Sequence, residues 1–189
     1  MNRKTLVSLE FSKIQDLLSK EADSPLGRDR ALEAFPGNVG QAKELQKLGR
    51  EIMEVLSRTS APSLSGVTDV RQKVTIASQG VTLSAEDLWR VLGVLSAAEV
   101  LRKWLLDLSS YHQLGRVLGR LPTLPALRLR LQQTVDEGGV VKDSASTALA
   151  TIRRQYRDFQ ERIRKRAEEM VRRKDIAQYL QEPIVTIRG

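Results

Sequence analysis

Ten basic side chains crowd into residues 151–174, where only four acidic residues accompany them. Guanidinium and ammonium groups at this density neutralise phosphates, and such contacts bind a nucleic-acid backbone without reading its base sequence. Because six of the charges have no acidic counterpart, we expect some of them to contact phosphates. The candidate nucleic-acid-binding residues are Arg153, Arg157, Arg164, Lys165, Arg172 and Arg173.

The same segment also fits a helix whose charges pair among themselves. Four pairs of opposite charge stand four residues apart, namely Arg154–Asp158, Arg157–Glu161, Glu161–Lys165 and Arg164–Glu168. Residues at this spacing meet on one helix face, and each pair stabilises the helix by roughly 0.2–0.5 kcal/mol. A solvated arm held by its own ion pairs and a phosphate-binding arm are therefore both open at this point.

The sequence offers few other residues for catalysis. It has no Cys and one His, His112, which excludes disulfides, thiolate zinc sites and a catalytic Cys. No phosphate-cradling P-loop, dinucleotide-binding, zinc-protease or nucleophile-elbow motif occurs. We expect no catalytic residue, no metal site and no bound cofactor in these 189 residues, and neither ATP hydrolysis nor DNA cleavage by them alone.

A long helix must carry the basic segment. From Ser146 to Lys174 the helical pattern is unbroken, about 40 Å at 1.5 Å per residue. Its apolar positions form what we call the apolar seam, with the three- and four-residue steps of a coiled coil and a last step of seven, where Arg166 takes the expected apolar position. The seam consists of Leu149, Ile152, Tyr156, Phe159, Ile163 and Met170.

The rest of the chain also has helical periodicity, with a Ser, Thr or Asn before most of the segments. The expected helices cover 6–22, 25–35, 39–58, 69–78, 85–108 and 125–135. Helix 85–108 is apolar on most of its faces and carries both tryptophans, which places it at the centre of a bundle. The sequence therefore predicts an all-α fold, an elongated multi-helix bundle with one long projecting coiled-coil-like helix. After Pro183, the β-branched residues 184–187 predict a truncated C-terminal strand.

Charge is uneven along the chain. The net charge is +8, and residues 101–189 hold 18 basic against 10 acidic residues while residues 1–100 hold 13 of each. A basic half indicates an anionic partner such as nucleic acid. No signal peptide or membrane-spanning run occurs, so we expect a cytoplasmic protein without a membrane partner.

Four segments, in this order, resemble the N-terminal part of the second bacterial MutS subfamily, here called MutS-two. They are Thr5-Leu6 with Leu9–Ile14, Leu64–Arg71 with Gly80 and Leu83-Ser84, Lys142–Ser146 with Leu149 and Ile152–Arg154, and Tyr179–Arg188. The resemblance runs from one end of the chain to the other. It implies that residues 1–182 form a helical core or lever domain, and that 183–189 begin a clamp.

The resemblance also implies a function for the full-length parent. Such a protein is a homodimeric ATPase that uses ATP and Mg, ends in a small-MutS-related (Smr) endonuclease domain, binds branched or duplex DNA and restrains homologous recombination. A second role on stalled or collided ribosomes is implied as well. The ATPase and nuclease motifs would lie beyond residue 189.

Two functions from different classes follow for the chain itself. The favoured one is a non-catalytic lever that transmits the ATPase state to a nucleic-acid clamp. The alternative is a helical docking module whose basic half binds ribosomal RNA or a partner protein. The salt dependence of binding to junction DNA, duplex DNA and ribosomes separates them, because phosphate contacts give a steep slope and protein docking does not.

Overall fold

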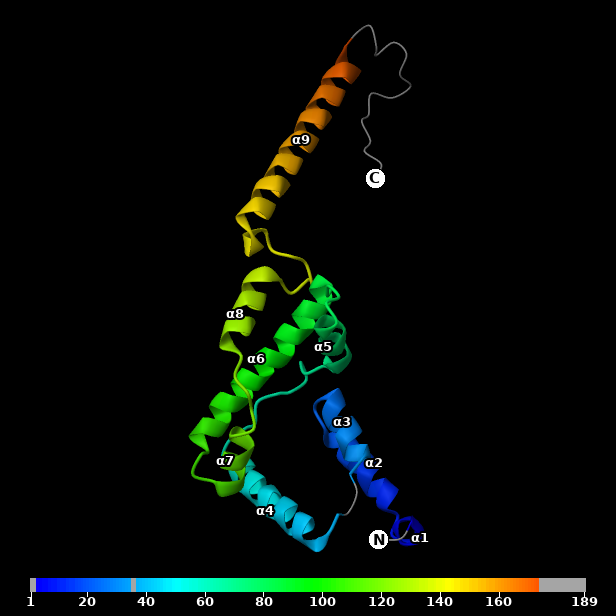
Figure 1. Cartoon of the computed structure of the whole chain (residues 1–189). Helices are drawn as coiled ribbons and strands as arrows, with labels where there is room; N and C mark the ends of the chain where they lie inside the picture. The colour runs from blue at the N-terminus through cyan, green and yellow to red at the C-terminus, as the bar shows by residue number, and fades with distance from the viewer. Residues whose placement is uncertain (1–2, 35–36, 174–189) are drawn as a thin grey trace. The chain divides into compact units, whose positions relative to one another are not determined.

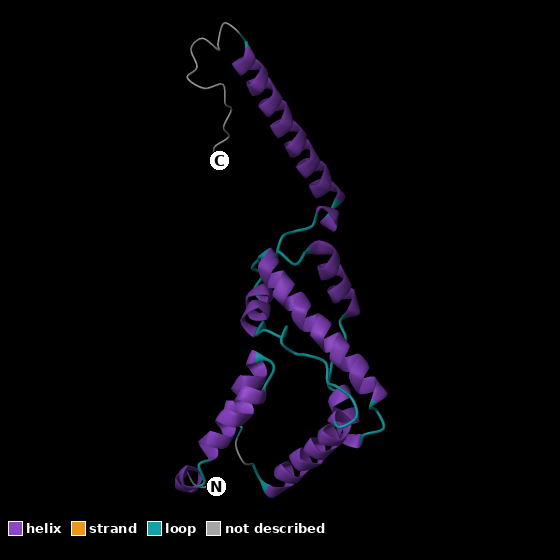
Figure 2. Cartoon of the chain, turned by 180° about the vertical axis from the view of Figure 1, so that it is seen from behind, coloured by secondary structure: helices purple, strands orange, loops and turns teal. Residues whose placement is uncertain are grey.

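The computed structural model describes residues 3–34 and 37–173 (Figure 1). Within these residues the regular structure consists of nine α-helices and one 3₁₀ turn, with no β-strand (Figure 2). The predicted all-α fold is confirmed. The chain divides into two compact units, residues 1–140 and 141–189. The predicted domain boundary at 182/183 and the predicted terminal strand lie outside the described residues.

The first helices do not follow the prediction of one helix over 6–22. The structure has α1 (Arg3–Ser8) and α2 (Phe11–Glu21), separated at Glu10, whose φ of 52° is left-handed and ends the helical ladder. Helix α3 (Pro25–Leu32) then packs against α2. The Gln15 amide joins them by donating to the Leu32 and Ala34 carbonyls, both at 2.7 Å.

One part of the core lies where α4 (Val39–Leu56), α6 (Ala85–Asp107) and α7 (His112–Leu118) meet. Val55, Leu105 and Leu114 are at most 2% exposed there. Helix α7 has no side-chain cap from its own N-cap residue. Instead Glu51 Oε2 accepts from the N–H groups of Gln113 and Leu114, at 2.8 and 3.1 Å. A carboxylate from α4 therefore completes the start of α7.

The other part of the core lies between α6 and α8 (Pro125–Thr134), around Leu92, Leu131 and Val135. Trp89 packs against this cluster and Trp104 packs against the first, so α6 contributes to both, and the two tryptophans, predicted as core residues, are half-buried at the edge of the core. The shorter α5 (Arg71–Ser78) is joined to α6 by an ion pair of 3.1 Å between Lys73 and Asp87.

The second unit begins with a 3₁₀ turn, η1 (Asp143–Ala145), followed by α9 (Thr147–Arg172). Ser146 caps α9 by accepting from the Leu149 N–H at 3.0 Å. The 26 residues of α9 make a helix of about 39 Å. This confirms the predicted long helix, and none of its residues is buried. Among the described helices, none has the length and apolar character that crossing a membrane requires.

Candidate nucleic-acid interface on helix α9

The apolar seam of α9 lies open to solvent. Ile152, Tyr156, Phe159 and Ile163 are 60–65% exposed, and Met170 is 48% exposed. Their spacing places them on one side of the helix, as the sequence predicts. A solvent-exposed apolar stripe of this regularity is typical of a surface that packs on another helix.

Two of the predicted phosphate-binding residues are tied to the start of the helix. The Arg153 guanidinium donates to the Asp143 carboxylate at 2.5 Å and to the Val141 carbonyl at 2.7 Å. Arg157 reaches the other oxygen of Asp143 at 3.4 Å. The hydrogen bond from Arg153, assisted by Arg157, lowers the pKa of Asp143 below its ordinary value. We call the contacts of Asp143 with Arg153 and Arg157 the Asp143 lock, because they hold η1 against α9. Arg153 and Arg157 therefore already have an anionic partner within the chain.

Two further candidates form ion pairs along the helix. Arg164 Nε lies 3.0 Å from Glu168, and Lys165 Nζ lies 2.8 Å from Glu161. These are two of the four pairs predicted at four-residue spacing. Arg157 takes Asp143 instead of Glu161, because η1 folds back beside the first turns of α9. Surface pairs of this kind are worth little and exchange readily with phosphate partners.

The unpaired basic residues are largely ones that the sequence did not single out. Among the described residues, Arg154, Arg166 and Arg172 have no ion-pair or hydrogen-bond partner for their side chains, and only Arg172 was a predicted candidate. Arg162 lies over the Phe159 ring, 5.8 Å from its centroid. Arg173, also a candidate, follows the helix, and its N–H donates to the Met170 carbonyl at 3.2 Å.

The positions of Arg154 and Arg172 give α9 two opposite faces. They stand 18 residues apart, five full turns of an α-helix, and so lie on the same side about 27 Å from each other. At 100° per residue this side is opposite the apolar seam. A helix packed through its seam would therefore still present these two guanidinium groups to solvent.

No family model matches this chain. Curated proteins named Endonuclease MutS2 match it over its whole length: the protein of Symbiobacterium thermophilum is 34% identical over 189 residues, and that of Pelotomaculum thermopropionicum 33% over 193. The MutS2 of Aquifex aeolicus is 29% identical over 194 residues. Over its whole length the chain is therefore similar to a part of the MutS2 proteins. It spans about a quarter of the length of these relatives, 24–25% of each.

The resemblance seen in the sequence is therefore confirmed, and one of its segments now has a structural role. Residues 142–146, part of one of the four segments that carry the resemblance, contain η1, the Asp143 lock and the cap of α9. The two arginines that follow differ in their contacts. Arg153 belongs to the Asp143 lock, whereas the side chain of Arg154 has no partner among the described residues. The segment that carries the resemblance is thus the one that anchors the start of the long helix.

Proposed function

We propose that this MutS2 segment is a non-catalytic lever module that binds nucleic-acid phosphates through α9 while its apolar seam packs on another helix of the full-length protein. The observation that carries the proposal is the opposition of the two faces of α9. The seam is apolar and open, and the opposite side carries Arg154 and Arg172 without partners among the described residues. One helix with these two faces can join a protein partner to a nucleic acid.

The contacts would be made to phosphates and not to bases. The aromatic side chains of α9, Tyr156 and Phe159, belong to the seam, so they are not placed to stack on bases. Arginine forks fit phosphate oxygens in pairs. We assign the first contacts to Arg154 and Arg172, because Arg166 lies three residues after Ile163 and four before Met170, beside the apolar seam. The paired candidates Arg164 and Lys165 would follow when a phosphate replaces their carboxylates.

The proposal extends to the whole protein as the resemblance describes it. The lever would transmit the state of an ATPase that binds ATP and Mg to a clamp on branched DNA, in a homodimer that restrains recombination. The same module would serve a protein that acts on stalled or collided ribosomes. The name endonuclease, carried by the relatives, agrees with a nucleic-acid substrate for the full-length protein.

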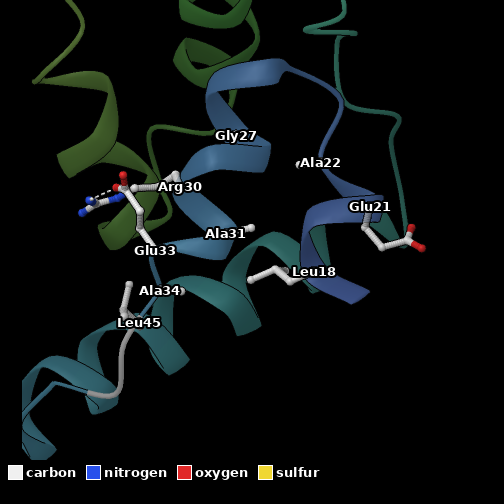
Figure 3. Close-up of a pocket in the computed structure, with 9 residues that line it drawn as sticks. All are labelled: Leu18, Glu21, Ala22, Gly27, Arg30, Ala31, Glu33, Ala34 and Leu45. Atoms are coloured by element: carbon white, nitrogen blue, oxygen red, sulfur yellow. Dashed lines mark ion pairs between the residues drawn. The ribbon is translucent and has the colours of Figure 1, made fainter. Parts of the chain in front are cut away.

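The alternative, a docking module for ribosomal RNA or a partner protein, is favoured by one observation in the first unit. An apolar hollow of about 690 Å³ lies between α2, α3 and α4, and Leu18, Ala31 and Leu45 line it (Figure 3). The apolar side chains of Ile14, Leu17 and Leu18 on α2 are 53–62% exposed. Exposed apolar patches beside such a hollow are typical of protein-binding surfaces.

Salt titration of two matched double variants tests the lever proposal. R154Q/R172Q removes two unpaired charges, and R164Q/K165Q removes two paired charges from the same helix. Removing one phosphate-binding cation should lower the salt slope for duplex or junction DNA by about one. We expect R154Q/R172Q to lower the slope by about two, and R164Q/K165Q to lower it less because Arg164 and Lys165 are already neutralised in part by Glu168 and Glu161.

Binding is measured by fluorescence anisotropy at several salt concentrations with labelled junction and duplex DNA. An equal decrease in affinity on several base sequences is expected, because phosphate contacts do not read bases. An unchanged slope in both variants would leave α9 as a solvated arm held by its own ion pairs. A shallow slope with tight binding to ribosomes would favour the docking module.

A further inference from the structure

A second hollow in the first unit has a different character from the apolar one. It measures about 790 Å³ and is formed by residues of α3, α4 and α7. Arg30, Arg116 and Arg120 reach it from α3, from α7 and from just after α7. Leu45, Leu48 and Val117 supply apolar lining. Its volume lies in the range of small-molecule sites, roughly 300–1,000 Å³.

The charge of this basic hollow is strongly positive. Glu44 is the one carboxylate among its lining residues, and it is already held by Lys47 at 2.8 Å and Arg116 at 3.2 Å. The hydrogen bond and charge of Lys47 lower the pKa of Glu44, so that carboxylate stays ionised and paired. The hollow therefore has no free carboxylate among its lining residues to neutralise the remaining guanidinium groups.

Arg30 and Arg120 are the cations of the hollow that neighbouring carboxylates neutralise least. Arg30 faces Glu33 at 3.8 Å, the limit of an ion pair, and its side chain is 86% exposed. Figure 3 shows this pair side by side at the edge of the neighbouring apolar hollow. Arg120 is exposed and has no side-chain partner among the described residues. A pair at the limiting distance in water contributes little, so Arg30 can turn to a better anion.

Two glycines line the basic hollow at the start of α4. Gly37 and Gly40 both line it, on either side of Asn38, the cap of α4. A Cβ on Gly37 would overlap Oε1 of Gln41, and one on Gly40 would lie 3.2 Å from Oδ1 of Asn38. Side chains at these positions would disturb the capping box that Asn38 and Gln41 form. Glycine at these two positions therefore leaves room for the capping box that borders the hollow.

We propose that the basic hollow binds the phosphate of a nucleotide, with Arg30, Arg116 and Arg120 on the phosphate oxygens and the base against Leu45, Leu48 and Val117. Guanidinium forks from three segments suit an anion with several oxygens. The nucleotide belongs either to a nucleic-acid strand or to a free mononucleotide, and both present the same phosphate. The site does not depend on α9, so it stands whether or not the lever binds DNA.

The test uses the 189-residue chain labelled with ¹⁵N and four probes. Adenosine 5′-monophosphate tests the free nucleotide, a single-stranded thymidine decamer tests the strand, adenosine lacks the phosphate, and a decamer of glutamate matches the charge of a strand. The readout is the chemical shift of the backbone amides of 37–41 and 116–120, which border the hollow and lie outside α9.

Two double variants with the same decrease in charge provide the comparison. R30Q/R120Q removes one weakly paired and one unpaired cation from the hollow. K103Q/R130Q does the same elsewhere in the first unit, since Lys103 faces Glu99 at 3.9 Å and Arg130 is exposed. We expect the affinity of the responding phosphate probe to fall at least tenfold in R30Q/R120Q and less than twofold in K103Q/R130Q.

The probes also separate the two sources. Tighter binding of the decamer than of the mononucleotide, with the same amides shifted, identifies a strand, and the reverse identifies a free nucleotide. The proposal is overturned if neither phosphate probe shifts these amides, if both double variants lose affinity equally, or if adenosine or the glutamate decamer shifts the amides as strongly. The variants R154Q/R172Q leave this readout unchanged, so failure here and failure of the lever proposal are distinguishable.

Discussion

Helices α6 and α9 are the two longest in the described chain, and they differ in whether their apolar side chains are buried. Helix α6, with 23 residues, contributes Leu92 and Leu105 to two parts of the core. Helix α9, with 26 residues, buries none and leaves four of the six seam residues 60–65% exposed. Helix α6, which is apolar on most of its faces, packs against other helices of its own chain. A helix with a single apolar stripe can present that stripe to another protein segment.

The two helices also differ in what holds their ends. Helix α6 packs against α7 and α8, which follow it in the chain, and Leu105 of α6 also clusters with Val55 of α4, 50 residues earlier. Helix α9 is held at its start by local contacts, the Ser146 cap and the Asp143 lock, and along its length by i,i+4 ion pairs. Tertiary burial supplies most of the stability of helices in proteins, so α9 should be the weaker of the two.

The largest expected effect comes from truncating one apolar side chain on each helix. Leu105→Ala should lower the free energy of unfolding by about 2–5 kcal/mol, because Leu105 is 2% exposed and a cavity would remain. Ile163→Ala, at a position 65% exposed, should change it by less than about 0.5 kcal/mol. Urea unfolding followed by circular dichroism and by the fluorescence of Trp89 and Trp104 measures both.

The difference between α6 and α9 is contradicted if Ile163→Ala lowers the free energy of unfolding as much as Leu105→Ala does. That result would mean that the seam is covered in solution, and a dependence of stability on protein concentration would identify a second copy as the cover. Unchanged stability of Ile163→Ala at every concentration would leave the seam available for a helix of the full-length protein.

A smaller effect comes from removing the same cap from each helix. Ser84 accepts from the Asp87 N–H at 3.1 Å at the start of α6, and Ser146 does the same for Leu149 in α9. Ser84→Ala should cost about 1 kcal/mol of global stability. Ser146→Ala should instead speed hydrogen exchange in the first turn of α9 and leave the unfolding of the tryptophan-bearing core unchanged.

Ser144→Ala is the matched control for the second cap. Ser144 lies in η1, is exposed and makes no side-chain hydrogen bond among the described residues. Its removal should leave hydrogen exchange in α9 as it is. Faster core unfolding in Ser146→Ala would show that α9 is coupled to α6 more strongly than its local contacts indicate.

Most of the helices were predictable because their signals are local. Helix α7 was not among the expected helices, since its N-cap residue Tyr111 gives no capping signal and its start depends on Glu51 of α4. The caps Ser24, Asn38, Ser84 and Ser146 all accept the hydrogen bonds that their positions predict. The break at Glu10 was not predictable, since no Gly or Pro marks it and a left-handed Glu is uncommon. Residue type alone gave no reason to divide residues 6–22 into two helices.

The candidate site was predictable only in outline. The basic segment and the seam follow from spacing along one helix, but the pairing of individual arginines depends on η1. Asp143 takes Arg153 and Arg157, 10 and 14 residues away, and this leaves Arg154 without a partner among the described residues. The basic hollow depends on three segments meeting, so Arg30 and Arg120 carried no signal in the sequence.

The smallest expected effect is a titration that compares two exposed aspartates, one in each unit. Asp69 is held by the neighbouring Arg71, which lowers its pKa to about 2. Asp143 is held mainly by Arg153, and its pKa also lies below the ordinary 3.8. Both carboxyls bind protons more weakly in the folded chain than in the unfolded chain. Their stabilising effect is therefore complete above the ordinary carboxyl pKa and disappears as the pH falls through the lowered pKa.

Carbon-13 NMR of the side-chain carboxyls measures both pKa values in one sample. Arg153→Gln should return the pKa of Asp143 toward 3.8 and leave Asp69 at about 2, because Arg71 still donates to Asp69. Lys165→Gln, the control on the same helix, should move neither, since Lys165 pairs with Glu161. If Asp143 already titrates at its ordinary value in the unaltered chain, the lock is open in solution. Arg153 and Arg157 would then be free for phosphates, and the candidate interface would extend to the start of α9.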